Sequence, residues 1–364
     1  MSMKIAIMGP APPYRGGISL FALMLARAFK ELGHEALFIN FEVQYPALLF
    51  PGKGQLDKSL NASEFANHRI IIPWLPSSWN QTIHLLLREK PDVIIVSWFL
   101  PFFAPAYGYI LRKLPKMPKV ILAHNISAHE KWALADKLMQ YAFEPASKIV
   151  VLSKSTLAEL HKKVPLFISR RGVLGFHPCY DCYVQNVGNP KKGNVLLFFG
   201  LIKPYKGLDV LLEAMPLILK SVPDTKLVVA GEVYGNVSVY LQQIQELGIA
   251  NAVETHFRYI SDPEIAHFFN QASLCVLPYK TASQSGVIAT SYSFGVPVLA
   301  TRVGGLGEYV LDGETGYLVP PLNKQKMAET IINHLQTKPD FSQAIDTYTR
   351  LYSWKALAEL MIAP

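Results

Sequence analysis

Blocks of apolar and polar residues follow one another along the chain, and the same order opens each half. In the first half the pattern predicts a strand over 4–8, a loop rich in Pro and Gly, and a helix over 18–32 whose apolar residues recur every three or four positions. In the second half it predicts a strand over 195–199 and, after another loop, a helix over 208–220. Repeated units of strand, loop and helix build parallel, doubly wound sheets, which bind ligands beyond the carboxyl ends of their strands.

The stretch from 274 to 316 predicts what kind of ligand the second half binds. An apolar strand over 274–277 ends at Pro278, and after a polar loop Gly286 opens a helical segment. A second strand over 296–300 leads into another glycine-rich turn. Small residues at such a turn let backbone N–H groups approach a ligand, and the helix dipole favours an anion there. The pattern is typical of an α/β domain that binds phosphate, and it favours a nucleotide-type ligand.

Residues 93–111 form a stretch of 19 residues without a charge, which is long enough to span a membrane. Pro101 and Pro105 would break it as a helix, so a buried strand over 93–96 is favoured instead. The alternative is a monotopic membrane contact through the aromatic residues between Trp98 and Tyr109.

The length and composition predict two folded domains. A chain of 364 residues is long for one domain, and half of its residues are apolar while 17% are charged. A segment rich in Pro and Gly over 175–193 is typical of a linker, so we expect a first domain over 1–185 and a second over 186–364. A C-terminal helix over about 346–364, around Trp354, is expected to pack back on the first domain. Three cysteines and no recognisable signal peptide favour the cytoplasm.

The positive charge is concentrated in the first domain. Residues 1–185 carry 21 Lys and Arg against 12 Asp and Glu, a net charge of +9, whereas the remainder carries 14 against 15, a net charge of −1. Such a surface suits anionic lipid headgroups or a pyrophosphate-bearing substrate, although a merely solubilising surface would look the same. Nucleic acid is not expected as a partner, because no recognition motif accompanies the charge. The cations gather in two clusters: Arg112, Lys113, Lys116 and Lys119, and Lys162, Lys163, Arg170 and Arg171.

Two loops that follow predicted strands carry candidate phosphate-binding residues. Gly16 and Gly17 lie at the first turn from strand to helix and could present amides to a phosphate, although a plain tight turn is equally compatible. The GxGxxG spacing is missing, which argues against a nicotinamide cofactor. In the second domain Lys203 and Lys206 follow the strand that ends before Gly200, where lysines can neutralise a diphosphate leaving group. The alternative is a pair of exposed loop lysines.

His124 follows a predicted strand over 120–122, and His129 and Glu130 come soon after it. A histidine in this position can hydrogen-bond a substrate near neutral pH. Zinc is disfavoured because the HExxH spacing is missing. The CxxC of Cys179 and Cys182 is half a zinc site and more often an ordinary linker, and no Asp-x-Asp supports a magnesium site.

Taken together, the motifs resemble those of the family 4 glycosyltransferases, which have the two-domain GT-B fold. The resemblance covers nearly the whole chain and is specific because the motifs occur in the family's order. They are Pro13-Tyr14-Arg15-Gly16-Gly17, His124 with His129-Glu130, Pro204-Tyr205-Lys206-Gly207, Ala230-Gly231-Glu232, Leu277-Pro278-Tyr279, Gly295-x-Pro297-Val298, Val303-Gly304-Gly305 with Glu308, and Asp312-Gly313-x-Thr315-Gly316.

The resemblance implies an α/β protein of two doubly wound, Rossmann-like domains facing a central cleft. It also implies a retaining, metal-independent transfer of a sugar from a nucleotide diphosphate donor, with no cofactor besides that substrate. The acceptor, a glycan or lipid-linked glycan, is expected on the basic first domain and the donor on the second. The protein is then expected in the cytoplasm and at the inner face of the membrane.

Site residues are carried over position by position. Lys206 matches the family's diphosphate-binding lysine, and His124 matches the histidine near the transferred sugar. The resulting catalytic candidates are His124, Lys206 and Lys203, and the donor-binding candidates are Gly16, Gly17, Gly200, Glu232, Ser285, Gly286, Val287 and Glu308. No residue is assigned to a metal.

The chain departs from the family at two places. Leu201 stands where the family usually has an arginine, and Lys203 is a candidate to substitute for it. The family's paired glutamates are missing, since residues 282–291 contain no carboxylate, and Glu232 and Glu308 are candidates for part of their role. This loss motivates two alternatives: a non-catalytic GT-B protein that binds a nucleotide or glycan, and a sugar-nucleotide epimerase that needs no acceptor.

Overall fold

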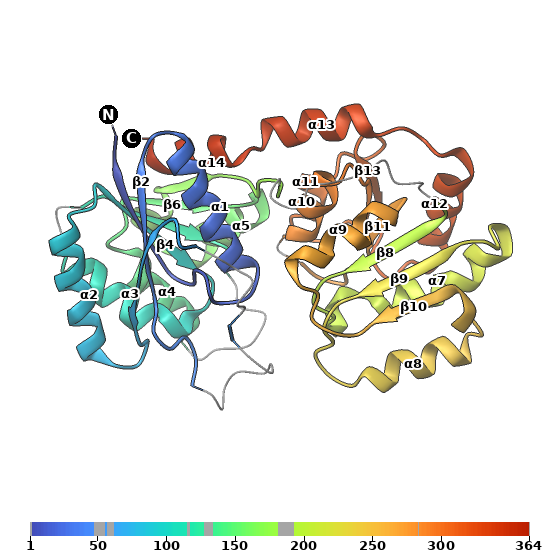
Figure 1. Cartoon of the computed structure of the whole chain (residues 1–364), viewed down its shortest axis with the longest axis horizontal. Helices are drawn as coiled ribbons and strands as arrows, with labels where there is room; N and C mark the ends of the chain where they lie inside the picture. Colours follow the sequence, from blue (N-terminus) through green and yellow to red (C-terminus); the bar gives the residue numbers. More distant parts are fainter. Residues whose placement is uncertain are drawn as a thin grey trace. The chain divides into compact units, whose positions relative to one another are not determined.

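The computed structural model describes residues 2–46, 55–56, 62–114, 117–126, 134–180, 193–282 and 284–363. The chain divides into two compact units, each with its own sheet and core (Figure 1). Unit 1 comprises Met1–Phe176 together with Ser353–Pro364, and unit 2 comprises His177–Tyr352.

The described part of unit 1 is built on a parallel sheet of seven strands in the order β3-β2-β1-β4-β5-β6-β7. The strands are β1 (Lys4–Met8), β2 (Glu35–Phe41), β3 (Ala66–Ile71), β4 (Val93–Trp98), β5 (Lys119–Ala123), β6 (Lys148–Val151) and β7 (Gly172–Leu174). The helices are α1 (Gly17–Glu31), α2 (Pro76–Glu89), η2 (Pro101–Phe103), α3 (Ala104–Arg112), α4 (Ala135–Phe143), α5 (Lys154–Lys163), α6 (Leu166–Ser169) and α14 (Trp354–Ile362).

Unit 2 has, within its described residues, a parallel sheet of six strands in the order β10-β9-β8-β11-β12-β13. The strands are β8 (Val195–Phe199), β9 (Lys226–Ala230), β10 (Val253–His256), β11 (Leu274–Leu277), β12 (Val298–Thr301) and β13 (Gly316–Val319). The helices are η4 (Pro204–Lys206), α7 (Leu208–Ser221), α8 (Val237–Glu246), η5 (Ala250–Ala252), α9 (Asp262–Gln271), α10 (Gly286–Ser293), α11 (Leu306–Tyr309), α12 (Lys324–Thr337) and α13 (Ser342–Leu351).

Both sheets are doubly wound, which confirms the expected fold class. The strand order reverses between β1 and β4 in unit 1 and between β8 and β11 in unit 2. At such a switch point the loops leave the two central strands in opposite directions and open a crevice at their carboxyl ends. The central strands β1, β4 and β11 are buried almost throughout, as strands covered by helices on both faces must be.

The last helix of the chain, α14, belongs to unit 1. Trp354 packs edge-on against Phe21 of α1, with ring centroids 4.7 Å apart, and Lys355 pairs with Glu31 at 3.1 Å. Leu357 of the same helix is fully buried and lies beside Gly175, which follows β7. The beginning and the end of the chain therefore share one core.

The uncharged stretch from 93 to 111 folds as the strand β4 followed by η2 and α3. Of its aromatic side chains, Trp98, Phe103 and Tyr107 are at most 2% exposed and lie in the core of unit 1, whereas Phe102 and Tyr109 are partly exposed. Among the described residues, no helix combines the length and apolar character needed to cross a membrane.

Candidate active site

The switch point of unit 2 brings together the loop after β8 and the loop after β11. Gly207 lies so close to the second loop that a Cβ there would be 2.0 Å from the carbonyl oxygen of Pro278, and its φ of +70° also favours glycine. The N–H of Lys280 donates to the carbonyl of Tyr205 at 2.7 Å. The two loops are therefore joined through their backbones, and the side chains they carry have fixed relative positions.

Lys206 lies at this joint, as the last residue of η4. Its Nζ is 4.9 Å from the ring centroid of Tyr279 and 3.8 Å from the position of a Cβ on Gly200. Burial lowers the pKa of the Lys206 ammonium, but the neighbouring Tyr279 and Tyr205 raise it by more, so the pKa lies above its ordinary value. The group is therefore positively charged at neutral pH, at the carboxyl end of the central strand β8.

The N-terminus of α10 lies at the same place. Val287, in the first turn of α10, is 3.4 Å from the Cβ position on Gly200, which in turn is next to Lys206. Ser285 is the N-cap: its hydroxyl accepts from the Val287 N–H at 3.4 Å and is 3.2 Å from the hydroxyl of Tyr279. The first turn of α10 has no acidic residue. Backbone amides and a lysine ammonium thus converge where a phosphate would gain from both.

The three other candidates of unit 2 also follow the carboxyl ends of strands. The Nζ of Lys203 lies 5.1 Å from the ring centroid of Tyr234, so the two lysines of the loop face different rings. Glu232 follows β9, and its carbonyl accepts from the N–H of Ile202 at 2.9 Å. Glu308 lies in α11, after β12, and is half-buried. All three are therefore at the sheet edge of Lys206, on neighbouring loops.

Sequence reasoning did not single out Tyr279 or His177 as site residues. Tyr279 comes two residues after the end of a buried strand, and this position is a usable signal. His177 lies in the expected linker, and the sequence there gave no signal. The structure places His177 Nε2 3.3 Å from the Cβ position on Gly286, at the start of α10. Its Nδ1 donates to the carbonyl of Pro178 at 3.0 Å, and its backbone N–H donates to the hydroxyl of Tyr309 at 3.2 Å.

The imidazole of His177 is neutral at physiological pH. Burial lowers its pKa to about 4, although the hydrogen bond to Pro178 opposes the shift. A carbonyl oxygen can only accept, so Nδ1 carries the proton and Nε2, beside Gly286, has a lone pair. His177 therefore adds no positive charge to the α10 N-terminus, and Lys206 supplies the cation there.

In unit 1 the turn between β1 and α1 is held by an asparagine. The side-chain amide of Asn40 donates to the carbonyls of Ala11 and Pro12 at 2.9 and 3.1 Å, and its oxygen accepts from the N–H of Ala11 at 3.2 Å. Gly16 is the N-cap of α1 with a φ of +111°, and a Cβ on Gly16 or Gly17 would meet nothing within 4 Å. The turn is thus fixed at its base and open at its tip, where a ligand could approach the amides.

His124 follows β5 and is 6% exposed. Its N–H donates to the carbonyl of Trp98 at 2.9 Å, and its ring packs edge-on against Phe21 of α1 at 5.0 Å. The structure therefore places His124 beside the helix that begins at Gly17. His129 and Glu130, which the sequence grouped with it, lie outside the described residues.

The cysteines add no metal centre to the described part of the chain. Cys179 is a buried thiol, whereas Cys182 lies outside the described residues. Burial raises the pKa of the Cys275 thiol, in β11, to about 12. Within the described ranges, no three His, Cys, Asp or Glu side chains form a group that could hold a metal ion.

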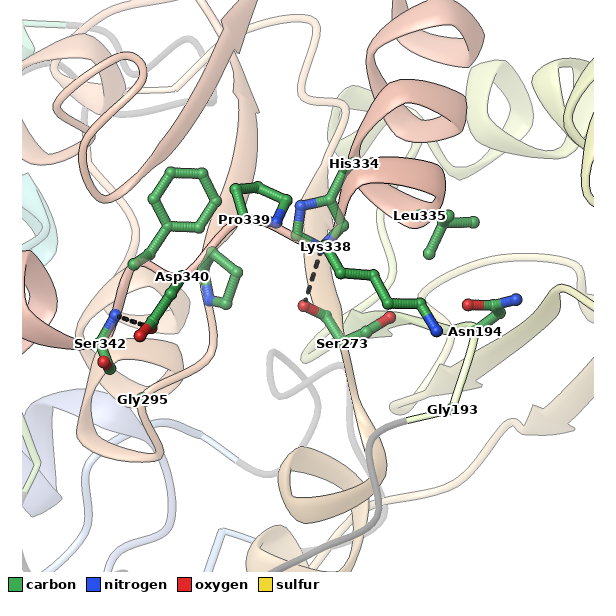
Figure 2. A pocket seen from close by; sticks show the side chains of 12 residues that line it. Gly193, Asn194, Ser273, Gly295, His334, Leu335, Lys338, Pro339, Asp340 and Ser342 are labelled. Carbon is green, nitrogen blue, oxygen red and sulfur yellow. Dashed lines mark hydrogen bonds between the residues drawn. The ribbon is translucent and has the colours of Figure 1, made fainter.

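Unit 2 also has a cavity of about 260 Å³, which lies apart from the candidate site around Lys206 (Figure 2). It is lined by Asn194, Ser273 and Pro297, which precede β8, β11 and β12, and by residues around Lys338 at the end of α12. It therefore opens at the amino ends of the strands, opposite to Lys206, and none of the predicted site residues lines it. Its histidine, His334, is already bonded to the carbonyl of Ser273 (Figure 2).

Two family models match this sequence, one on each unit. The model described as Glycosyltransferase Family 4 matches residues 15–169, and the model described as Glycosyl transferases group 1 matches residues 193–337. The first match contains Gly16, Gly17 and His124, and the second contains the loop of Lys206 and the N-terminus of α10.

Similar proteins extend over the whole chain. An uncharacterized glycosyltransferase of Methanocaldococcus jannaschii is 23% identical, with 97% of this chain and 95% of that protein covered. A D-inositol 3-phosphate glycosyltransferase of Pseudarthrobacter chlorophenolicus is 30% identical, with 95% of this chain and 89% of that protein covered. In structure, Anabaena HepE in complex with UDP and glucose matches with a TM-score of 0.76 at 17% identity, over 98% of each chain.

Proposed function

This chain belongs to the family 4 glycosyltransferases and has their GT-B fold, and on that premise we propose that it moves a sugar from a nucleotide diphosphate sugar to a glycan or lipid-linked glycan. The proposed transfer retains the anomeric configuration and needs no metal ion or other cofactor.

The observation that carries the proposal is the convergence of Lys206 with the N-terminus of α10. A nucleotide diphosphate gains negative charge as its bond to the sugar breaks. The ammonium of Lys206 and the amides of Gly286 and Val287 lie together at the switch point, where that charge would develop. Because these groups are fixed before the reaction, they stabilise the leaving diphosphate without the cost of reorganisation.

The remaining candidates have supporting roles in this proposal. Lys203 is on the same loop and adds a second positive charge. Glu232 and Glu308 provide carboxylates at this edge of unit 2, in a chain that has none over 282–291. In unit 1, Gly16 and Gly17 present amides to the donor, and His124 orients the transferred sugar and the acceptor. A closed site excludes water from the reaction.

The acceptor is proposed to bind unit 1, where the excess of cations suits a substrate linked to an anionic lipid or pyrophosphate. The protein would then work in the cytoplasm and at the inner face of the membrane, in the assembly of a polysaccharide or glycolipid.

Calorimetric titration with UDP, GDP and ADP, then with their sugar conjugates, tests the donor site. A related fold is described with UDP and glucose, so UDP-glucose is the first donor to try. We expect one nucleotide to bind, and Lys206→Ala to weaken its binding and lower turnover about a hundredfold. Lys220→Ala, at an exposed lysine of α7, is the matched control. Near-normal turnover in Lys206→Ala would contradict the proposed role of this lysine.

The same samples separate transfer from the two alternatives. Free nucleotide diphosphate that appears only when acceptor is present shows transfer, whereas an epimerase would act on the donor alone. Binding of a nucleotide without any transfer to a panel of acceptors would favour the non-catalytic protein that the missing carboxylates suggested.

A further inference from the structure

The two cationic clusters predicted from sequence differ in how much of their charge faces solvent. In the first cluster, Arg112 pairs with Glu144 and stacks over Tyr141 at 3.8 Å from the ring centroid. Lys119 is 6% exposed, and burial lowers its pKa. Lys116 lies outside the described residues. Lys113 is exposed and lies over the ring of Tyr109, with its Nζ 5.8 Å from the centroid. Of the three described cations of this cluster, one is therefore paired with a carboxylate, one is buried and one faces solvent.

The second cluster is open. Lys162 and Arg170 are exposed, and among the described residues no carboxylate pairs with either of them. Lys163 pairs with Asp136 at 3.0 Å, and Arg171 donates to the carbonyls of Glu144 and Ala146. No acidic residue occurs from 161 to 171, so the segment has a strong local excess of positive charge.

Between these cations lies a short apolar tip. Leu166 and Phe167, the first two residues of α6, are 61% and 54% exposed. Their neighbours Val164 and Ile168 are buried in the core of unit 1. The buried pair anchors the turn, so Leu166 and Phe167 stay outside it at a fixed position. A single exposed apolar residue needs no explanation, but two adjacent large ones flanked by unpaired cations do.

We propose that the segment from Lys162 to Arg170, with Leu166 and Phe167 at its tip, is the surface by which this protein contacts an anionic membrane. Leu166 and Phe167 enter the boundary between headgroups and acyl chains, while Lys162 and Arg170 lie against anionic headgroups. An acidic protein surface would satisfy the cations but would leave the apolar tip without a matching environment.

The contact lies at the amino edge of the unit 1 sheet. Helix α5 runs back from the carboxyl end of β6, and α6 leads into the start of β7. Gly16 and His124 lie at the opposite edge. The membrane contact therefore leaves the proposed acceptor edge uncovered, which suits a lipid-linked glycan whose growing end extends away from the bilayer. To this extent the inference rests on the proposed function.

The test is co-sedimentation of the full chain with vesicles of phosphatidylcholine alone and of phosphatidylcholine mixed with phosphatidylglycerol. We expect binding to the anionic vesicles only, and weaker binding as salt is raised. Leu166→Ser with Phe167→Ser should lower the partition coefficient about tenfold. Lys162→Ala with Arg170→Ala should lower it about fivefold for each cation removed.

Matched controls are Leu351→Ser, at a leucine that is 65% exposed in α13 of unit 2, and Lys220→Ala in α7. Both should bind vesicles as the unmodified protein does. Equal binding to neutral and anionic vesicles, no binding to either, or unchanged binding by the Leu166/Phe167 double variant overturns the inference. Nucleotide titration of the same samples keeps the two proposals apart, because vesicle binding without nucleotide binding counts against the proposed function alone.

Discussion

Lys203 and Lys206 lie three residues apart, yet their charges face different surroundings. The 3₁₀ turn η4, which begins at Pro204, ends at Lys206 and brings its Nζ to Tyr279 and Gly200. Lys203 precedes the turn in an extended conformation and lies over Tyr234. The loop sequence shows two lysines beyond a strand, but only the turn between them decides which one faces the N-terminus of α10.

His177 makes stability depend on pH. Its pKa is about 4 in the folded protein and about 6.5 in the unfolded chain, so between these pH values the unfolded state binds a proton that the folded state does not. The stabilisation is therefore fully present above pH 6.5 and is lost as the pH falls toward 4. The shift corresponds to about 3 kcal/mol in the free energy of unfolding.

We expect His177→Asn to remove this component. Urea unfolding followed by far-ultraviolet circular dichroism at pH 7 and pH 4 should show a smaller loss of stability in the variant, by about 3 kcal/mol. His267→Asn in α9 is a control for the loss of another histidine of unit 2. The same pH dependence in His177→Asn and in the unmodified protein would show that this imidazole is not responsible.

At the scale of elements, the contact between two loops holds the proposed donor site together. We expect Gly207→Ala to destabilise the protein by about 2 kcal/mol and to weaken nucleotide binding, because a Cβ there would collide with the carbonyl of Pro278 and separate the loops. Gly248→Ala is the matched control: its φ of +64° is close to the +70° of Gly207, but nothing lies within 4 Å of its Cβ position.

Urea midpoints and UDP titrations of the two variants separate the effect of backbone strain, which both share, from that of the Cβ collision with Pro278, which only Gly207→Ala has. Both should lose some stability from the left-handed backbone, but only Gly207→Ala should lose nucleotide affinity. Equal nucleotide affinity in both variants would mean that the joint between the loops does not position Lys206.

Buried central strands are the elements that the sequence predicts best. The strands expected over 4–8, 195–199 and 274–277 have the same bounds in the structure, because parallel strands covered on both faces are short, continuous apolar runs. The edge strand β3 was not expected, since it mixes Asn67, His68 and Arg69 with apolar residues and is half-exposed. The strand expected over 296–300 begins two residues later, at Val298.

The sequence predicts those residues of the candidate site that follow the ends of central strands. Gly200, Lys206 and Gly286 follow central strands, and the carboxyl ends of those strands meet at one switch point. The approach of His177 to Gly286 joins residues that are far apart in sequence and on no common strand end. It depends on where residues 177–180 lie against unit 2, and no local pattern encodes that.

At the scale of the whole molecule, unit 1 contains the first and the last of the described helices, α1 and α14. The strands of its sheet all precede residue 177 in the sequence, whereas α14, which packs on α1, follows the whole of unit 2. All five tryptophans, Trp74, Trp79, Trp98, Trp132 and Trp354, belong to unit 1, so tryptophan fluorescence reports on this unit alone. Nucleotide binding at the switch point of β8 and β11 reports on unit 2.

We expect Leu357→Ala to destabilise unit 1 by about 3 kcal/mol, because this fully buried leucine of α14 lies against Gly175, next to β7, and its truncation leaves a cavity. Urea unfolding followed by tryptophan fluorescence should shift accordingly, while nucleotide affinity at low urea should stay unchanged. Leu351→Ala, at the exposed end of α13, should change neither signal. If Leu357→Ala weakened nucleotide binding as much as it destabilised unit 1, the two units would fold as one cooperative body, and the assignment of α14 to the core of unit 1 alone would be wrong.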